Sequence, residues 1–281
     1  MIRHFLIHGD CHGNFTWMMT GALDDYKPEE TAIIILGDAG FDFYLNQLDD
    51  RKKKEVNSRG FRIYWLRGNH EARPQDIPGY EKIYDEDVHN VVYCDPRFPN
   101  LRAFMDYGVY DIQGYDCLVI GGAYSVDKYY RLERANLTEE TNDPKQSGWF
   151  ANEQLSDVEK QEAEDMIETY QFHGNVPCFD FVFTHTCPYS WEPSDLFLNG
   201  VDQSTVDSTT EKWLDKLKDS MFWDIWCFGH FHADRIERPY VEQYYRDTED
   251  INTIYDRWIT YKNTGELPWW IQKGPNFNVD N

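Results

Sequence analysis

Five short apolar segments recur along the chain, and each leads into a polar motif that contains glycine or threonine. The segments cover residues 5–7, 32–36, 61–66, 179–183 and 225–228. Apolar runs of this length that stop at glycine or polar residues are typical of strands buried on both faces. Helical stretches are expected between these strands, so the pattern predicts a layered α/β fold.

The polar motifs supply Asp, Asn and His side chains. In chain order they read Gly9-Asp10-Cys11-His12-Gly13, Gly37-Asp38, Gly68-Asn69-His70-Glu71, Thr184-His185 and Gly229-His230-Phe231-His232. Binding residues of α/β sheets gather at the carboxyl ends of the strands, so these motifs are expected to meet. Because side chains alternate along a strand, Asp10 and His12 should share one side while Cys11 points away. The same alternation pairs His230 with His232 and turns Phe231 toward the core.

The types of donor indicate the chemistry. The motifs offer enough oxygen and nitrogen atoms for two adjacent metal ions, with one histidine left over. Carboxylate, amide and imidazole donors without thiolate suit Mn, Fe or Zn. Two metal ions about 3.5–4 Å apart lower the pKa of a shared hydroxide and clamp phosphate oxygens. The sequence therefore predicts an enzyme that hydrolyses phosphate esters. The remaining histidines are expected to be structural: His4, His8, His89 and His173.

The motif set D-x-H, G-D, G-N-H-[DE], H and G-x-H runs in this order from Gly9 to His232 and resembles that of the calcineurin-like metallophosphoesterase superfamily. The resemblance implies a four-layer α/β/β/α sandwich and a dinuclear metal site holding Mn²⁺ and/or Fe, with Zn²⁺ as an alternative. We expect one domain over residues 1–281, with an inserted, loop-like region near 124–150.

The resemblance also implies roles for single residues. Seven of them would be metal ligands: Asp10, His12 and His232 for one ion, Asn69, His185 and His230 for the other, and Asp38 for both. The free histidine would be His70, which protonates the leaving oxygen or stabilises charge beside it. A histidine suits this role because its ordinary pKa lies near the working pH.

Part of the motif set is similar to the serine/threonine phosphoprotein phosphatase branch, notably Leu66-Arg67-Gly68-Asn69-His70-Glu71. That branch continues its second motif as G-D-x-V-D-R-G, and its arginine grips the substrate phosphate. Here Asp42 is displaced by one position and the arginine is absent. Purple acid phosphatases are disfavoured as well, because their metal-binding tyrosine would fall on Phe41.

The net charge constrains the substrate. The chain has 27 basic and 50 acidic residues, and 27 − 50 gives −23. Such a surface repels nucleic acids, whose binding depends on Lys and Arg, so a small phosphorylated substrate is expected, either a monoester or a diester. Three alternatives remain: a nuclease of the same superfamily, a phosphoprotein phosphatase, or a non-catalytic metal-binding scaffold. Arg67 and Arg131 are candidate contacts to the substrate phosphate, with Arg73 and Lys128 as further candidates.

Sequence features also suggest a compartment. Six scattered cysteines without a C-x-x-C pair are expected to be reduced, which favours the cytoplasm. The sequence shows no signal-peptide pattern and no apolar run of about 20 residues, so no membrane association is expected.

Several further elements can be predicted. Helices are expected from Asn14 through Leu23, after the capping-box pair Ser156 and Glu159, over residues 208–220, and after the cap Asp247-Thr248. Strands are expected over 117–120 and 241–245. The basic run 51–54 is expected to form a solvated helix end.

Overall fold

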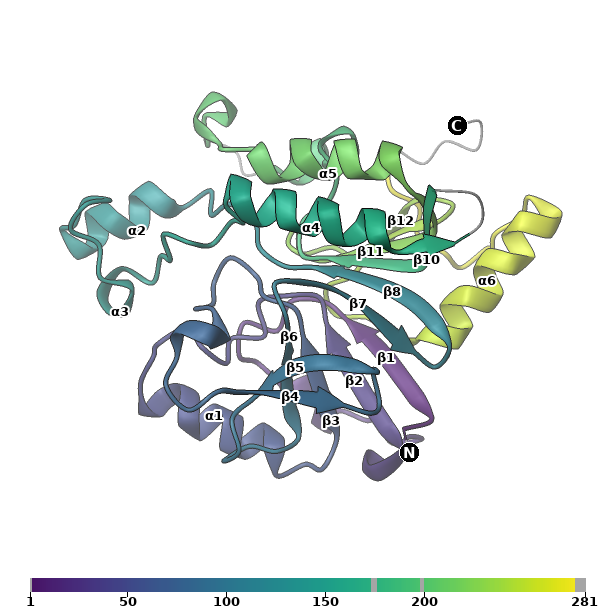
Figure 1. Ribbon diagram of the computed structural model, residues 1–281, viewed down its shortest axis with the longest axis horizontal. Coiled ribbons are helices and arrows are strands. Elements are labelled where there is room, and N and C mark those ends of the chain that lie inside the picture. The colour runs from purple at the N-terminus through teal and green to yellow at the C-terminus, as the bar shows by residue number, and fades with distance from the viewer. Residues whose placement is uncertain (1, 173–175, 198–199, 276–281) are drawn as a thin grey trace.

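Two seven-stranded sheets lie face to face at the centre of the protein (Figure 1). The structure, a computed structural model, describes residues 2–172, 176–197 and 200–275. The first sheet has the order β14-β1-β2-β3-β6-β5-β4, and β1, β2, β3 and β6 run parallel. Its strands are β1 (His4–His8), β2 (Thr31–Ile35), β3 (Arg62–Trp65), β4 (Glu81–Asp85), β5 (Asn90–Cys94), β6 (Leu101–Phe104) and β14 (Thr248–Asp250).

The second sheet has the order β12-β13-β11-β10-β8-β7, and the short strand β9 pairs with β10. Here β8, β10, β11 and β13 run parallel. Its strands are β7 (Tyr107–Ile112), β8 (Tyr115–Ile120), β9 (Gln171–Phe172), β10 (Val176–Thr184), β11 (Phe222–Phe228), β12 (Arg235–Arg238) and β13 (Val241–Gln243).

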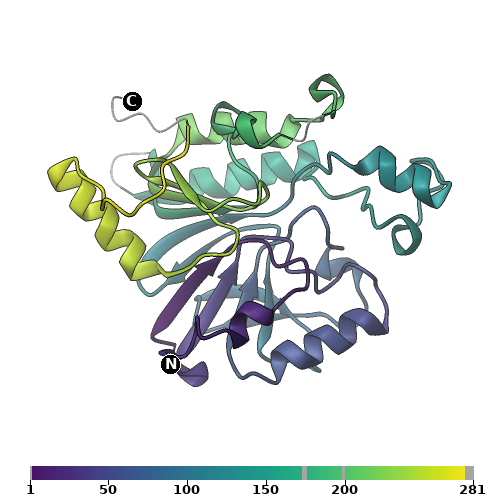
Figure 2. The ribbon, with the colours of Figure 1, turned by 180° about the vertical axis from the view of Figure 1, so that it is seen from behind.

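Helices cover the outer faces of both sheets. Helix α1 lies on the first sheet, α4 and α5 lie on the second, and α6 runs along the side of the sandwich beside β1, β14 and β11 (Figures 1 and 2). The α-helices are α1 (Gln47–Asn57), α2 (Lys128–Ala135), α3 (Pro144–Ser147), α4 (Asp157–Thr169), α5 (Thr209–Ser220) and α6 (Ile251–Thr264). Short 3₁₀ helices are η1 (Thr16–Met19), η2 (Pro28–Glu30), η3 (Pro74–Asp76), η4 (Tyr189–Trp191), η5 (Ser194–Leu196) and η6 (Gln203–Thr205).

The layers follow from apolar residues on both faces of each central strand. In β2, Ile33 and Ile35 pack with Val56 of α1 in an outer cluster. Ile34, between them, belongs to the cluster between the sheets together with Phe183 of β10. Side chains alternate across a strand, so a strand with alanine or isoleucine at four successive positions must be covered on both sides. The expected α/β/β/α arrangement is confirmed.

Three of the predicted helices are present. Helix α4 begins after Ser156, and Ser156 and Glu159 form the expected capping box. Helix α5 matches the expected 208–220 region. Helix α6 is also present, but its N-cap is Asp250 rather than Asp247-Thr248. The displacement has a simple cause, because Thr248–Asp250 pairs with β1 as strand β14 before the helix starts.

Two expectations for other segments were wrong. Residues 14–23 form the short η1 and turns instead of an α-helix, and Gly21 has a φ of 88° that ends the segment. The region 124–150 is not a plain loop, since it carries α2 and α3 and projects from one end of the sandwich (Figure 1). Helix α2 ends at Asn136 and α3 at Gly148, both in the left-handed conformation that commonly closes helices.

The basic run 51–54 lies within α1 and is only partly solvated. Lys53 is buried and pairs with the buried carboxylate of Asp42, which also accepts from the Tyr80 hydroxyl at 2.7 Å. Lys52 Nζ donates to the carbonyl oxygen of Gly40 at 2.6 Å. The expectation of a solvated helix end was therefore wrong, because these two lysines tie α1 to the loop that carries Asp42.

Two further observations concern the whole of the described chain. All six cysteines are free, as their scattered spacing predicts. Within the described ranges, no helix combines the length and the apolar character that a bilayer crossing requires.

The capping box of α4 gives a stability prediction. We expect Ser156→Ala to lower the free energy of unfolding by about 1 kcal/mol, because the Ser156 hydroxyl caps the backbone amide of Glu159. Ser208→Ala is the matched control, since Ser208 is the N-cap of α5 and makes no side-chain capping bond. Urea denaturation checks the difference. Equal losses for the two variants would contradict a capping role for Ser156.

Candidate metal centre

The polar motifs meet at one end of the sandwich. They follow the carboxyl ends of β1, β2 and β3 in the first sheet and of β10 and β11 in the second. The parallel registers of β1, β2 and β3, and of β10 and β11, bring these ends to a common edge. The expected meeting of the motifs is therefore present, and both sheets contribute to it.

The first group of donors consists of Asp10, His12 and His232, which come from the two sheets. The Nε2 atoms of His12 and His232 lie 2.8 Å apart. His232 Nε2 is 3.4 Å from Asp10 Oδ2. Asp10 Oδ2 is buried without a hydrogen-bond partner among the described residues, whereas Oδ1 accepts from the backbone amide of His230 at 2.9 Å. One carboxylate oxygen is thus fixed by the backbone, and the other is free for a ligand.

The second group surrounds His185. Its Nδ1 donates to the carbonyl oxygen of Leu36 at 2.8 Å, which leaves Nε2 without a proton in the neutral ring. Nε2 lies 2.9 Å from Asn69 Oδ1 and 3.6 Å from Asp38 Oδ2. The ring of His230 lies beside that of His185, and the two ring centroids are 5.0 Å apart. A backbone acceptor that orients a histidine in this way is the usual support of a metal ligand.

Asp38 lies at the centre of the site. Its Oδ1 accepts from the backbone amide of His70 at 2.8 Å. Its Oδ2 is 3.6 Å from His185 Nε2, 3.8 Å from His70 Nε2 and 3.9 Å from His12 Nδ1. Ligand atoms of Asp10, Asp38 and His185 also lie within 4.8 Å of one another. Asp38 is therefore the carboxylate that links the two groups of donors.

The backbone of the site is held in an uncommon conformation. Four of its residues have left-handed φ values: His12 at 44°, Asp38 at 47°, His230 at 67° and His232 at 53°. Such values are rare for residues with a Cβ atom and cluster at functional sites. Glycine is needed close by, because a Cβ atom at Gly68 would lie 2.0 Å from Asp38 Oδ1.

Burial and mutual charges determine how these groups titrate. Burial acts to raise the pKa of Asp38, but His70 and His185 hold it well below its ordinary value. Burial acts in the opposite direction on His185, whose pKa the charges of Asp38 and Asp10 raise to about 9. Burial and the nearby His185 lower the pKa of His230 to about 3. The carboxylates of the site are thus charged, as metal ligands must be.

His70 stands apart from its neighbour Asn69, as their adjacent positions require. Its Nε2 is 3.4 Å from Nη2 of Arg131, which is held by Asp127 at 2.7 Å and by the carbonyl oxygen of Gly148 at 2.6 Å. Burial, opposed by Asp38 and reinforced by Arg131, lowers the pKa of His70.

The other candidate phosphate contacts lie elsewhere. Arg67 is buried and donates to Asp106 at 2.6 Å and to the carbonyl oxygen of Glu153 at 2.6 Å. Arg73 pairs with Glu159 and Asp106. Lys128 pairs with Glu139 at 2.7 Å. All four cations have partners in the structure, and among the four Arg131 is the one shown within 3.4 Å of His70.

The histidines expected to be structural do not share one environment. His4 bonds Asp250 at 2.9 Å, and the buried His8 bonds Thr248 at 2.9 Å and stacks on Trp17. His89 is exposed, and His173 lies outside the described residues.

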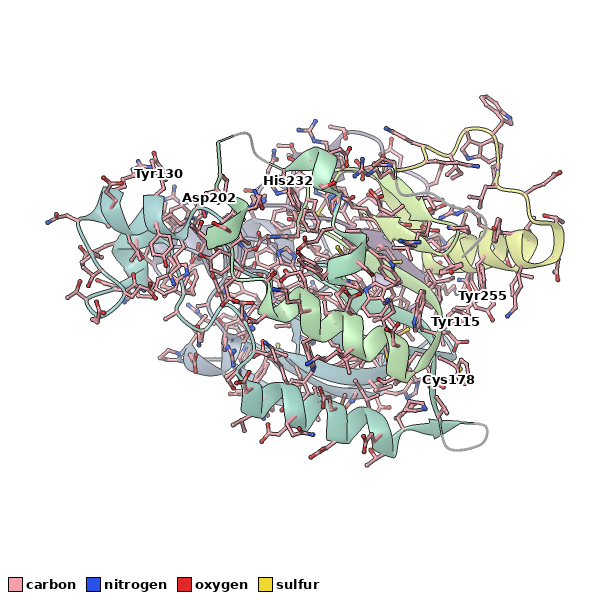
Figure 3. All side chains as sticks on the ribbon, turned by 90° about the horizontal axis from the view of Figure 1, so that it is seen from above. Tyr115, Tyr130, Cys178, Asp202, His232 and Tyr255 are labelled. Carbon is pink, nitrogen blue, oxygen red and sulfur yellow. The ribbon has the colours of Figure 1, made fainter. Side chains whose placement is uncertain are left out.

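A cavity of about 360 Å³ opens beside His70. Residues from the metal-centre motifs, from the loop before α2, and from segments between η4 and α5 line it. Phe231 packs against the core cluster beside Phe228, as expected, and it also lines this cavity because it is only partly buried. In the view of Figure 3, Asp202, the N-cap of η6, is seen between His232 and Tyr130 of α2.

Two glutamates in this cavity were missed by the sequence analysis. Glu211 lies in the first turn of α5 and is 5% exposed, and Glu192 follows η4. Burial raises the pKa of both carboxyl groups to about 7, and the charge of Glu211 contributes to the shift of Glu192. An acidic residue in a first helical turn is ordinary in a sequence, so no local signal distinguishes Glu211.

The raised pKa of Glu211 predicts a pH dependence of stability. The folded state binds this proton up to about pH 7, whereas the unfolded chain releases it near 4.5. The wild type should therefore lose stability relative to Glu211→Gln as pH rises from 4.5 to 8, by on the order of 2–3 kcal/mol. The exposed Glu168→Gln on α4 is the control. Denaturation at several pH values checks this, and parallel curves for wild type and Glu211→Gln would refute it.

Comparison with known proteins agrees with this geometry. The sequence profile of the calcineurin-like phosphoesterase family matches residues 3–234. The chain therefore belongs to the calcineurin-like phosphoesterase family, which supports metal-dependent hydrolysis of phosphoesters in general, and its Asp–His groups could bind metal.

Other comparisons are more distant. No protein of curated function is detectably similar to the chain. One crystal structure matches 90% of this chain and 96% of its own, with 10% identity and a TM-score of 0.44. The sulfate thiohydrolase SoxB of Thermus thermophilus, solved with glycerol, has 15% identity and a TM-score of 0.33. That match covers 83% of this chain and 37% of SoxB.

Proposed function

We propose that the protein hydrolyses small phosphoesters at a centre of two metal ions. The observation that carries this proposal is the meeting of Asp38 with six other donor side chains, with His70 left over beside a cavity. Family membership supports the same reaction class.

The donors fit metal ions rather than a set of ordinary hydrogen bonds. Asp10 Oδ2 is buried and unpartnered in the described part of the chain, and the imidazole nitrogens of His12 and His232 approach each other at 2.8 Å. A buried carboxylate oxygen without a donor is costly unless a cation satisfies it. Converging lone pairs of this kind are the arrangement that a bound cation requires.

We propose the ligand sets that the family resemblance implies, and the grouping of Asp10, His12 and His232 supports the first of them. Asp10, His12 and His232 would hold one ion, Asn69, His185 and His230 the other, and Asp38 would join both. Oxygen and nitrogen donors without thiolate suit Mn²⁺ or Fe, with Zn²⁺ as an alternative. Such a pair of ions supplies an activated water and neutralises charge on the phosphoryl oxygens.

The remaining groups would handle the leaving alcohol. As a water oxygen that has released one proton to solvent bonds to phosphorus, the bond from phosphorus to the ester oxygen breaks, and His70 gives its proton to that oxygen. A phosphoryl group beside His70 favours the protonated ring, which offsets the effect of burial on its pKa. Arg131 lies 3.4 Å from His70 and can orient a phosphoryl oxygen.

The substrate class follows from charge and from the second motif. The net charge of −23 disfavours long nucleic acids, and the position that follows Asp42 holds no arginine to grip a phosphoprotein. A small monoester or diester therefore fits best.

The test is an activity screen of protein reconstituted with Mn²⁺, Fe²⁺ or Zn²⁺. Its substrates are nitrophenyl monoesters and diesters, small nucleotides, a phosphopeptide and duplex DNA. We expect kcat/KM to be higher for the small esters at physiological salt. A higher value for DNA or the phosphopeptide would overturn the substrate class, and no hydrolysis with any metal would overturn the function.

A further inference from the structure

The cavity beside His70 is negatively charged. Its charged lining residues other than histidine are Asp38, Asp127, Glu192 and Glu211, and no Lys or Arg lines it among the described residues. Asp127 is neutralised by Arg131, and Asp38 belongs to the metal centre. The charges of Lys212 and Lys160 act on Glu192 and Glu211 respectively, but neither lysine lines the cavity.

Of these two glutamates, Glu211 provides the stronger evidence for a bound ligand. Its side chain lines the cavity, is 5% exposed, and its Oε2 has no hydrogen-bond partner in the described part of the chain. Burial of an unpartnered carboxyl oxygen costs free energy that the native protein must recover elsewhere. Glu211 lines the cavity, so a ligand there that donates a hydrogen bond would meet its carboxyl group.

The rest of the cavity wall is largely apolar. Its apolar and aromatic residues are Tyr124, Val126, Tyr189, Leu196, Val206 and Phe231, among others. A volume of about 360 Å³ falls in the range of pockets that hold small molecules. Aromatic walls such as Tyr124 and Phe231 suit a ring or another flat apolar group.

The orientation of a substrate follows from the residues shared with the metal centre. Asn69, His70 and His230 line the same cavity. A phosphoryl group at the metal centre therefore directs its ester oxygen toward His70 and its alcohol portion into the cavity. The part of the substrate that meets Glu192 and Glu211 is the far end of the leaving alcohol.

We propose that the enzyme selects phosphoesters whose alcohol has an apolar, ring-sized body ending in a hydrogen-bond-donating nitrogen, accepted by Glu211 and Glu192. This inference rests on the proposed function. The nitrogen belongs either to a protonated amine or to the N–H edge of a heterocycle, and both donate to carboxyl oxygens. An anionic alcohol is rejected, because it would meet the buried Glu211 and the partly buried Glu192.

A matched series of aryl phosphates tests the selection. 4-(2-Aminoethyl)phenyl, 4-ethylphenyl and 4-(2-carboxyethyl)phenyl phosphate share one aromatic body and differ in the charge at its end. We expect kcat/KM to fall in that order, by roughly 10- to 100-fold from the amine to the neutral ester, the range for a charge-assisted hydrogen bond. Guanosine and inosine monophosphates form the second arm, because only guanine carries the extra amino group. If guanosine monophosphate is preferred over inosine monophosphate but the aminoethyl ester is not preferred over the ethyl ester, the nitrogen that the cavity accepts belongs to a heterocycle.

Variants locate the effect. Glu211→Gln should lower kcat/KM for the nitrogen-bearing esters by about 10-fold or more relative to kcat/KM for 4-ethylphenyl phosphate. Glu168→Gln, an exposed change on α4, should alter neither. Equal rates for the three aryl esters together with equal rates for the two nucleotides, or an equal loss on all esters in Glu211→Gln, would overturn the proposal.

A binding measurement separates this proposal from the proposed function. Calorimetry with metal-free protein compares tyramine with 4-ethylphenol, and guanosine with inosine, which are the product alcohols of the two arms. Tighter binding of tyramine or guanosine that is lost in Glu211→Gln supports the cavity assignment even if no ester is hydrolysed, in which case only the proposed function fails. No preference in either pair overturns the cavity assignment, whatever the activity.

Discussion

Asp38→Asn should remove metal from both sides of the centre at once. Asp38 Oδ2 lies within 4 Å of nitrogen atoms from three histidines, so it is the group that both proposed metal sites share. Loss of its charge leaves two adjacent cations with less to offset their repulsion. We expect metal per chain to fall from near two to well below one, and kcat/KM to fall about 10³-fold or more.

Elemental analysis and melting temperatures measure this result. Chelation should lower the melting temperature of the wild type, because ligands that bind only the folded state stabilise it. The same treatment should have little effect on Asp38→Asn. Asp42→Asn is the matched control, since Asp42 is an equally buried carboxylate that pairs with Lys53 instead of facing the donors. Full metal content in Asp38→Asn would contradict the shared role.

The His70→Ala variant should retain its metal ions but hydrolyse phosphoesters much more slowly. His70 lies 3.8 Å from Asp38 but belongs to neither proposed ligand set, so its loss leaves the donors in place. We expect turnover to slow by roughly 10²–10⁴-fold, the range for loss of a positioned general acid. The loss should be smaller for nitrophenyl esters than for alkyl esters, because nitrophenolate leaves without a proton.

The comparison needs metal content and rates on the same samples. His89→Ala serves as the control, because it removes an exposed imidazole outside the site. If His70→Ala loses metal, His70 is a ligand and our assignment of its role is wrong. Equal losses across leaving groups would instead argue against proton transfer by this residue.

The sequence predicted the sheets better than the segments between them. Strands such as β2, with five buried residues in a row, are specified by local composition alone. The same holds for the capping box of α4, in which Ser156 and Glu159 are three residues apart. The prediction for segment 14–23 failed because Phe15, Met18 and Leu23 are buried in the outer cluster from η1 and its flanking turns, so their burial needs no α-helix.

The candidate site shows the same division. The motifs placed eight polar side chains at one edge because strand ends in a parallel sheet have a fixed location. The cavity wall depends on how the chain between β10 and β11 folds back, and nothing local marks Glu192 or Glu211 as neighbours. The prediction that Arg67 contacts the substrate phosphate failed for a related reason. Its position next to Gly68 in the sequence does not reveal that it pairs with Asp106.

The use of donors from both sheets has a consequence for biosynthesis. Asp10, in the first sheet, and His232, after the last central strand of the second, lie 3.4 Å apart in space but at opposite ends of the matched family region. A ribosome adds residues in order, at about 5–20 per second. A nascent chain that has reached Asn69 already carries four of the donors and still lacks every donor of the second sheet. Stable loading of the proposed metal centre would therefore wait until nearly all of the sandwich has been synthesised and closed.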